Sequence, residues 1–284
     1  MQGSRNKYWA FALRAITALC YAILALPLLY GLWLTVRCFG MDYFSIPSHS
    51  MEPTLYPGDK VVVNKLIMGA RIYTDLHFNL EGVELKCFRT KGFRRIRHND
   101  MVVFNFPFHD GKIKFVINNV FCKRVVALPG DSIWTVGGYY RNNNYQGVLG
   151  IESSQRKFAQ MPDTLFTKEA FAALPYDMEH VPSTIKNMHA VYVPHKGDVV
   201  RLTPFEAAYY RMILEWETGK KITWDWQTQS VFADGKRLFR HTFAHDYYFM
   251  AGDNVADSND SRYWGLVPEE YIVGVVGYVY HGKE

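Results

Sequence analysis

The fold is decided by the stretch Ser45-Ile-Pro-Ser-His-Ser-Met-Glu-Pro-Thr-Leu-Tyr-Pro-Gly-Asp59, which separates an apolar amino-terminal segment from a β-rich remainder. Each of its three prolines fixes φ and removes a backbone donor, so the stretch cannot be helix interior and is a poor central strand. We expect a stiff, exposed loop that presents Ser48 and Ser50. Stiffness suits a nucleophile, which must be held near its substrate. A plain Ser/Pro turn is the alternative at this point.

An uncharged apolar segment precedes this loop. Residues 15–36 are mostly Ala, Leu, Ile or aromatic, and about 20 such residues span the apolar core of a bilayer. Arg5, Lys7 and Arg14 precede the segment, whereas a single arginine follows it closely. The positive-inside bias therefore places the basic tail, residues 1–14, in the cytoplasm and the bulk of the chain outside. A cleaved secretory signal is the alternative, but its apolar core is usually only about 7 to 15 residues long.

The remainder of the chain shows a repeated pattern that predicts antiparallel β structure. A turn ending in Asp is followed by a β-branched or aromatic run, which is typical of a half-buried strand. Two Gly-containing turns, 136–139 and 233–236, predict hairpins. One helix is expected at 205–218, closed by Gly219, and residues 141–190 lack regular periodicity. The four strand starts are Pro57–Val63, His98–Phe104, Pro129–Trp134 and His195–Arg201.

Charge and cysteine content restrict the classes of partner. The net charge is +5, and six basic residues lie between positions 86 and 98. In an outward-facing domain this basic segment is closer to anionic lipid headgroups than to nucleic acid; a solvated loop is the alternative. The cysteines lack the Cys-x-x-Cys spacing of metal sites. A Cys87–Cys122 disulfide is permitted outside the cytoplasm, but nothing requires it.

A serine nucleophile needs a base, and Lys123 is the candidate. It lies in the apolar run Phe121-Cys-Lys-Arg-Val-Val126, where loss of hydration lowers the pKa of an amine from about 10.4. A neutral amine can accept the proton of a serine. Arg124 must face the opposite side of the strand, so one of the two basic groups should point to the covered face. An exposed, charged Lys123 is the alternative.

Other motifs are weaker. The G-x-S-x-G elbow of α/β-hydrolases is absent. Ser183-Thr-Ile-Lys186 fits the S-x-x-K motif of penicillin-recognising enzymes, but the K-T-G and S-D-N partner motifs of those enzymes do not occur. His241 and His245 have helical metal-ligand spacing, but the surrounding aromatic residues favour a strand. We therefore expect no metal.

The polar loop Met250–Pro268 is dense in Asn, Asp and Ser, which shape compact turns. Arg262 can form a bidentate pair with a carboxylate such as Asp260. Ser258 is the candidate hydroxyl that orients the lysine amine.

Together these residues carry a family resemblance. The chain resembles the type I signal peptidases, membrane-anchored Ser/Lys endopeptidases that remove signal peptides from exported preproteins. Ser48-His-Ser-Met-Glu-Pro-Thr-Leu55 matches the S-x-S-M-x-P-T-L box, and Pro57–Lys65 matches the segment after it. Cys122–Asp131 matches the lysine box, and Gly252–Arg262 matches the last box without a gap.

The resemblance implies a role for each matched residue. Ser50 would be the nucleophile and Lys123 its general base, Ser48 would supply an oxyanion-hole hydroxyl, and Ser258 would orient the lysine. The Asp–Arg pair of the last box would support that loop. Six further residues would shape shallow pockets for small side chains, usually Ala, at P1 and P3: Phe44, Ile46, Met51, Leu55, Phe121 and Cys122.

The resemblance also implies a mainly β fold with two antiparallel subdomains after the transmembrane helix, and we expect an inserted helical or irregular region within it. The catalytic core would comprise residues 41–135 and 245–284, and 136–244 would be an inserted β subdomain with one helix. The protein would cross the bacterial cytoplasmic membrane once, with its catalytic domain on the outer face. Its partners would be secretory preproteins and membrane lipid, with no nucleic acid, metal or cofactor; the oligomeric state stays open.

The chain departs from the family pattern at three positions. His49 replaces a usual Gly, and Val255 and Ala256 stand where Arg and a polar residue are common. A side chain at position 49 could narrow the cleft or add a titrating group, so the departures bear on substrate range. A catalytically inactive, membrane-tethered scaffold of the same fold is the alternative function, and intact Ser50 and Lys123 speak against it.

Overall fold

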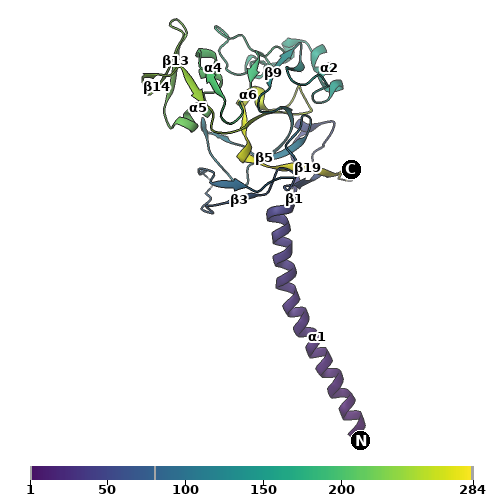
Figure 1. The fold of residues 1–284 in the computed structure, drawn as a ribbon. Coiled ribbons are helices and arrows are strands. Elements are labelled where there is room, and N and C mark those ends of the chain that lie inside the picture. Colours follow the sequence, from purple (N-terminus) through teal and green to yellow (C-terminus); the bar gives the residue numbers. More distant parts are fainter. Residues whose placement is uncertain (1, 80, 283–284) are drawn as a thin grey trace.

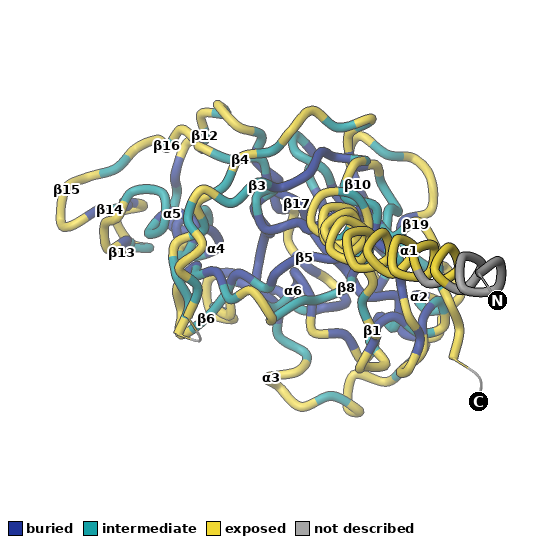
Figure 2. Tube along the Cα trace, turned by 90° about the horizontal axis from the view of Figure 1, so that it is seen from below, coloured by how far each residue is buried: buried dark blue, intermediate teal, exposed yellow. Residues whose placement is uncertain are grey.

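The computed structural model describes residues 2–79 and 81–282, and it shows a long helix standing on a β-rich body (Figure 1). Helix α1 (Gln2–Thr35) continues into a π-helical turn (Val36–Gly40), and its apolar side chains from Trp9 onward are exposed (Figure 2). The segment from Trp9 to Gly40 is long and apolar enough to cross a membrane, as expected for residues 15–36.

Some residues used in the sequence predictions lie outside this description. The side chains of Arg5 and Lys7, on which the predicted orientation partly rests, are among them, as are residues 283–284 at the end of the predicted core.

A seven-stranded antiparallel sheet forms the centre of the body, in the order β1-β2-β19-β5-β8-β17-β18. The chain leaves this sheet after β8 and returns to it with β17, so segments more than a hundred residues apart become neighbours (Figure 1). The strands are β1 (Met41–Ser45), β2 (Lys60–Asn64), β5 (Met101–Asn105), β8 (Val120–Ala127), β17 (Tyr247–Ala251), β18 (Val267–Pro268) and β19 (Ile272–Tyr280).

Smaller sheets and short helices surround this sheet. The fold is mainly β, as predicted. The paired strands are β3 (Arg71–Tyr73) with β4 (Cys87–Arg89), β6 (Phe108–His109) with β7 (Lys112–Ile113), β9 (Ser132–Val136) with β10 (Tyr139–Asn142) and β11 (Val191–Tyr192), β12 (Val199–Arg201) with β16 (Arg240–Thr242), and β14 (Ser230–Ala233) with β13 (Ile222–Asp225) and β15 (Lys236–Arg237). The helices of the body are α2 (Glu152–Gln160), α3 (Lys168–Phe171), α4 (Pro204–Tyr209), α5 (Arg211–Thr218) and α6 (Ser261–Trp264).

The four predicted strand starts are confirmed as β2, β5, β9 and β12, and both predicted hairpin turns connect paired strands. The prediction of a single helix at 205–218 is wrong, because this segment forms two separate helices, α4 and α5. The break lies at Tyr210, whose backbone has φ −91° and ψ 10°. Its ring is buried against Phe243, and its hydroxyl donates to Tyr192 O at 2.5 Å, so tertiary contacts override the helical pattern.

The segment 141–190 belongs to the insertion that was expected to be helical or irregular, and it contains α2 and α3. Helix α2 buries only Gln155 and Phe158. The Gln155 amide accepts from Tyr140 N and donates to Leu149 O, so a polar side chain occupies a core-facing position. The usual apolar periodicity of a helix is therefore missing from the sequence.

A small apolar core holds the Ser45–Asp59 loop against the sheet. The ends of the loop are joined by backbone hydrogen bonds from Ile46 N to Asp59 O (2.8 Å) and from Gly58 N to Ile46 O (2.9 Å). The core beneath it consists of Ile46, Met51, Leu55, Val61, Val63, Val103 and Val273. The loop is thus pinned at both ends and along its apolar side.

Two glycines of β19 offer a matched test of this packing. A Cβ on Gly274 would lie 2.8 Å from Asn64 O and from Val63 Cγ1, whereas a Cβ on Gly277 would meet nothing closer than 3.9 Å. We expect Gly274→Ala to lower the free energy of unfolding by roughly 1–3 kcal/mol through overpacking. Gly277→Ala should change it by less than about 0.5 kcal/mol. Urea unfolding of the chain in detergent measures both, and equal stability of the two variants would contradict the described packing.

Candidate active site

The nucleophile candidate Ser50 lies in a 3-10 turn, His49–Met51, within the pinned loop. Met51 is buried under the turn, so the backbone is fixed while the serines remain accessible. Ser48 Oγ lies 3.3 Å from Ser50 Oγ. Two hydroxyls are therefore presented side by side, as the prolines of this stretch predict.

Lys123 lies on the covered face of β8 and is only 3% exposed. Its Nζ is 2.5 Å from Ser50 Oγ and 3.2 Å from Ser258 Oγ. Arg124 points to the other side of the strand and pairs with Asp253, with 2.6 Å between Nη2 and Oδ2. An amine held between two hydroxyls can direct its lone pair at one of them while it donates to the other.

Burial lowers the pKa of the Lys123 amine below its usual value of 10.5, and the negative charge of Asp260 opposes this only in part. Because the folded-state pKa is depressed, the folded protein binds fewer protons than the unfolded chain between that pKa and 10.5. At pH values below the folded-state pKa, burial of the amine therefore has its full destabilising effect. This effect disappears as the pH rises to 10.5.

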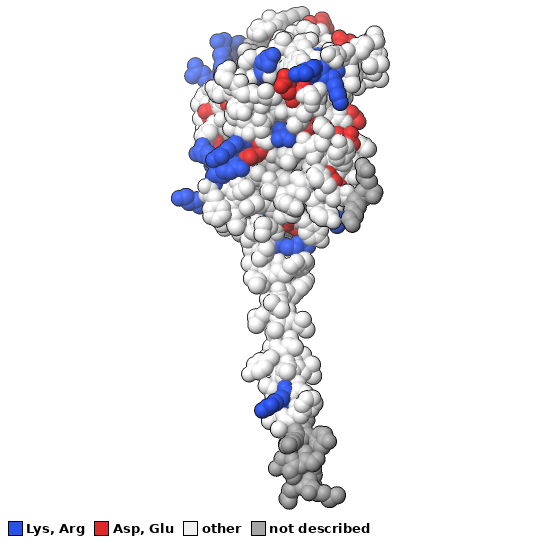
Figure 3. Space-filling model, turned by 90° about the vertical axis from the view of Figure 1, so that its right-hand side faces the viewer, with Lys and Arg blue, Asp and Glu red and all other residues white. Residues whose placement is uncertain are grey.

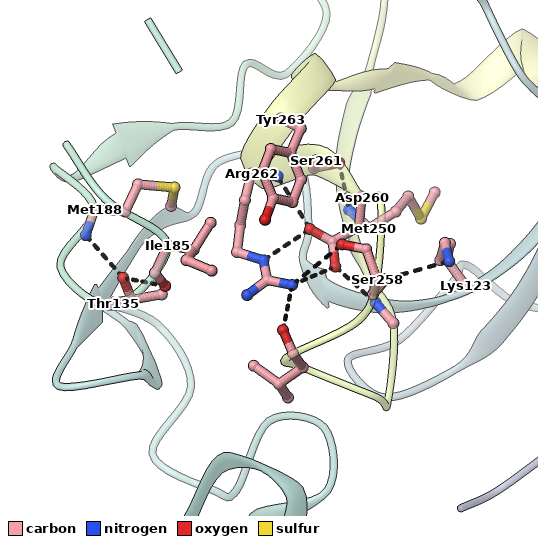
Figure 4. Close-up of polar contacts among 12 residues, drawn as sticks. Lys123, Thr135, Ile185, Met188, Met250, Ser258, Asp260, Ser261, Arg262 and Tyr263 are labelled. Carbon is pink, nitrogen blue, oxygen red and sulfur yellow. Dashed lines mark hydrogen bonds and ion pairs between the residues drawn. The ribbon is translucent and has the colours of Figure 1, made fainter. Parts of the chain in front are cut away.

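A buried ion pair organises the loop that carries Ser258 (Figure 4). Arg262 Nε and Nη2 contact the two carboxylate oxygens of Asp260 at 2.8 and 2.9 Å, and neither side chain is exposed. Burial alone would raise the pKa of Asp260, but the charge and hydrogen bonds of Arg262 outweigh it and hold that pKa below its usual value. Arg262 Nη2 also donates to Val255 O at 2.8 Å, so the pair ties together both ends of the loop.

The loop that carries Ser258 is bound to the Ser45–Asp59 loop, called the nucleophile loop below, by contacts that the sequence did not predict. Asn254 N donates to Ser50 O at 3.1 Å, and Asn254 Nδ2 donates to His49 O at 3.2 Å. Thr54 Oγ1 donates to Asp253 at 2.5 Å, and Asp253 in turn pairs with Arg124. The sequence offered one signal for these contacts. Arg124 is adjacent to Lys123, and Asp253 and Asn254 directly follow Gly252, all within the matched boxes.

Gly252 allows this close approach of the two loops. A Cβ on Gly252 would lie 2.1 Å from Ser258 Oγ and 2.4 Å from Ser50 O. These distances are far below a van der Waals contact, so any side chain at this position must displace the Ser258 hydroxyl or the Ser50 backbone.

A cleft of about 450 Å³ opens beside Ser50 and Lys123. Five of the six predicted pocket residues line it, and the prediction for Leu55 is wrong because Leu55 is 0% exposed and lies in the core beneath. His49 lies at the cleft, with Nδ1 2.6 Å from Glu52 Oε1. The lining is apolar on the β1 and β8 sides and polar near Asp257 and Asn259: Phe44, Ser45, Ile46, Pro47, Ser48, His49, Ser50, Met51, Val103, Val120, Phe121, Cys122, Lys123, Asp257 and Asn259.

The cysteines are free thiols. Cys87 lies on β4 and Cys122 on β8. Burial raises the pKa of the Cys122 thiol to about 12, so this sulfur stays protonated near neutral pH.

The remaining candidate motifs serve other contacts. His241 Nε2 lies 2.5 Å from Glu217 and His245 Nδ1 lies 2.7 Å from Glu270, so the two imidazoles have different carboxylate partners. Lys186 Nζ binds Met161 O and Asp163, at 2.5 and 2.8 Å. Among the described residues, no group of three or more His, Cys, Asp or Glu could hold a metal ion.

The family model and the relatives found by comparison with known proteins point to the same family. A family model described as signal peptidase, peptidase S26, matches residues 16–281. The chain is 27% identical to a signal peptidase I of Pseudomonas fluorescens over 85% of this chain and 65% of that protein. It is 27% identical to a signal peptidase I of Helicobacter pylori strain J99, over 94% of this chain and 83% of that protein.

A solved structure is also similar. A signal peptidase I from Enterococcus faecalis V583 matches with 16% identity and a TM-score of 0.31, over 64% of this chain and 97% of that one. The match thus spans 65% of the length of the Pseudomonas relative and 83% of the length of the Helicobacter relative.

The depressed pKa of Lys123 can be measured directly. We expect the ¹³Cε resonance of Lys123 to titrate below the usual lysine pKa of 10.5, because burial disfavours the charged amine. The measurement is an NMR pH titration of ¹³C-lysine-labelled protein, with Lys123→Arg assigning the resonance. Co-titration of Lys123 with the exposed lysines would contradict a desolvated amine.

Proposed function

The chain belongs to the signal peptidase, peptidase S26, family, and we propose that it is a membrane-bound serine endopeptidase that removes amino-terminal signal peptides from exported preproteins. Ser50 is the nucleophile and Lys123 the general base. The observation that carries this proposal is the buried Lys123 amine, 2.5 Å from Ser50 Oγ, beside an open cleft.

In the first step Ser50 Oγ attacks the carbonyl carbon of the scissile bond, and its proton passes to Lys123 Nζ. The amine must be neutral to accept this proton, so activity requires a pH at which Lys123 has lost its own. The hydroxyl of Ser258, 3.2 Å from Nζ, accepts a hydrogen bond from the amine and directs its lone pair to Ser50.

The tetrahedral intermediate places a negative charge on the former carbonyl oxygen. Donors preorganised toward such an oxygen are worth about 2.7–4 kcal/mol each in comparable enzymes. The Ser48 hydroxyl and the Ser50 backbone N–H are the proposed donors, and the 3.3 Å between the two hydroxyls supports a shared oxyanion site.

Collapse of the intermediate breaks the C–N bond, and Lys123 returns its proton to the leaving amine. The ester formed on Ser50 is then hydrolysed by water, with Lys123 again acting as base. One group thus serves both proton transfers, as microscopic reversibility requires. The scheme uses no metal or cofactor.

The cleft supports specificity for small residues, of the Ala-x-Ala type, at P1 and P3. Ile46, Met51 and Cys122 contribute an apolar lining to the cleft that also contains Ser50, and we propose that this part of the cleft is shallow. Apolar side chains of the substrate gain from burial there, and bulky ones lack depth. His49 at the rim is the position where this chain departs from the family most directly.

The location of the site follows from the anchor. We propose a single membrane crossing, with the basic tail in the cytoplasm and the body on the outer face of the bacterial cytoplasmic membrane. In this proposal, residues 41–135 and 245–284 form the catalytic core of the protein, and residues 136–244 are an insertion. Lipid is the proposed second partner, because exposed Phe88 and Phe93 accompany the basic segment at 86–98.

An inactive scaffold of the same fold is the alternative. The neutral-lysine geometry argues against it, because burying an amine lowers stability and a binding protein gains nothing from that loss.

Substitution of the two reacting groups tests the proposal. We expect Ser50→Ala and Lys123→Ala each to lower cleavage of a secretory precursor by about 10³-fold or more, since each removes an essential part of the acyl transfer. Cleavage is measured in detergent with a precursor that carries an Ala-x-Ala site. Ser153→Ala and Lys168→Ala, at exposed positions, serve as controls and should cleave normally. Full activity of Ser50→Ala would refute the mechanism.

Gly252→Ala tests the contact between the two loops. The added methyl must displace the Ser258 hydroxyl or the Ser50 backbone, so we expect kcat to fall by about 10²-fold or more with little change in KM. Gly197→Ala is the control, because its Cβ would meet nothing within 4 Å and its φ of +92° adds only local backbone strain. Near-normal kcat in a folded Gly252→Ala protein would show that the close approach is dispensable.

A further inference from the structure

Three charged residues hold the anchor to the sheet and take no part in the proposed chemistry. Arg37 Nε and Nη2 lie 2.9 and 2.8 Å from Asp42 Oδ1. Lys65 Nζ donates to Arg37 O at 2.6 Å and lies 3.4 Å from Asp42 Oδ2. We call Arg37, Asp42 and Lys65 the junction clamp; basic and acidic atoms are visible where the helix meets the body (Figure 3).

The clamp connects the helix and the sheet on several sides. The Arg37 guanidinium carbon lies 5.1 Å from the Trp33 ring in α1 and 5.2 Å from the Tyr43 ring in β1, both within cation–π range. Lys65 N donates to Gly40 O at 2.8 Å, which satisfies a carbonyl at the end of the helical segment. The side chains of Lys65 and Asp42 are only 12% and 14% exposed, so their pairing is shielded from solvent.

The connection between the anchor and the cleft is short. The π-helical turn ends at Gly40 and β1 begins at Met41, with no linker between them. An extended strand rises about 3.4 Å per residue, so Ser45, which lines the cleft, lies at most about 17 Å from Gly40. A short and clamped connection restrains both the height of the cleft above the bilayer and its tilt.

We infer that the junction clamp is a specificity-determining device for substrates held in the same membrane. It selects precursors by the number of residues between their membrane-embedded apolar segment and the scissile bond. About five extended residues cover the same 17 Å. A tethered substrate reaches a high effective concentration at the cleft only where its span matches that distance. The inference rests on the proposed peptidase function and adds a spacing preference to it.

The test compares membrane-held and soluble substrates with the full chain in phosphatidylethanolamine/phosphatidylglycerol vesicles. One substrate series is a set of membrane-inserted precursors that share one cleavage site. The number of residues between their apolar segment and the scissile bond changes by one from each precursor to the next. The other substrate is a soluble peptide with the same cleavage site. The variants are Lys65→Met and Asp42→Asn, and Lys168→Met removes an exposed lysine outside the clamp as a control.

We expect the unsubstituted protein and Lys168→Met to show one spacing optimum. In Lys65→Met and Asp42→Asn, kcat/KM for the optimal precursor should fall about fivefold or more, and the differences among spacings should shrink, because the cleft is no longer held at one height. Cleavage of the soluble peptide should stay within about twofold. Hydrogen exchange of the Lys65 amide should be faster in both variants, since its bond to Gly40 O is loosened.

Two results would overturn the inference. One is an unchanged spacing profile in both variants, and the other is an equal loss on the precursor and on the soluble peptide, which indicates that the clamp only supports the fold. If Lys65→Met does not unfold cooperatively and is therefore not properly folded, the result of the isosteric variant Asp42→Asn decides whether the inference holds. Failure of the unsubstituted protein to cleave either substrate would instead refute the proposed function.

Discussion

The desolvation of one amine is the constraint on which the site depends. Lys123 is buried on β8 at 3% exposure, and burial is the largest influence on its pKa. In the proposed mechanism Lys123 accepts the proton of Ser50, which an exposed lysine, charged near neutral pH, cannot do. The sheet must therefore keep water from this side chain while it leaves Ser50 open to the cleft, and the nucleophile loop packed over the amine satisfies both demands.

The Asp260–Arg262 pair makes that desolvation compatible with a polar loop. Asp260 alone would stabilise the charged amine and raise the pKa of Lys123, whereas Arg262 lowers it. Arg262 Nε lies 2.8 Å from Asp260 Oδ1 and both side chains are fully buried, so Arg262 offsets part of the effect of Asp260 on the amine, and burial remains the largest influence. A buried pair of this kind is weak as a source of stability. Its value here is that it fixes Ser258 without adding a net charge beside the lysine.

The sequence predicted the parts of this structure that depend on local pattern. Prolines around Ser50, the apolar neighbours of Lys123 and the Gly-Asp turns are local signals, and the corresponding loop and strands are present. The contacts among Thr54, Asp253 and Asn254 were not predicted, because they join segments about two hundred residues apart. The break at Tyr210 and the core-facing Gln155 were missed for a related reason: each side chain is hydrogen-bonded to backbone outside its own helix, between 6 and 18 residues away, and such bonds have no trace in local periodicity.

The edge of the main sheet links the membrane to the chemistry. Strand β1 begins beside the junction clamp and ends at Ser45 on the cleft, and β2 pairs with it from Lys60 to Asn64, one residue before Lys65. Every residue of β1 is thus held by a hydrogen-bonded partner strand whose far end is bound to the anchor. A two-stranded edge restrained at one end transmits orientation with little loss, since bending it would break ladder hydrogen bonds. The short connection from the anchor to the cleft is therefore a property of the sheet itself, and not of a flexible tether.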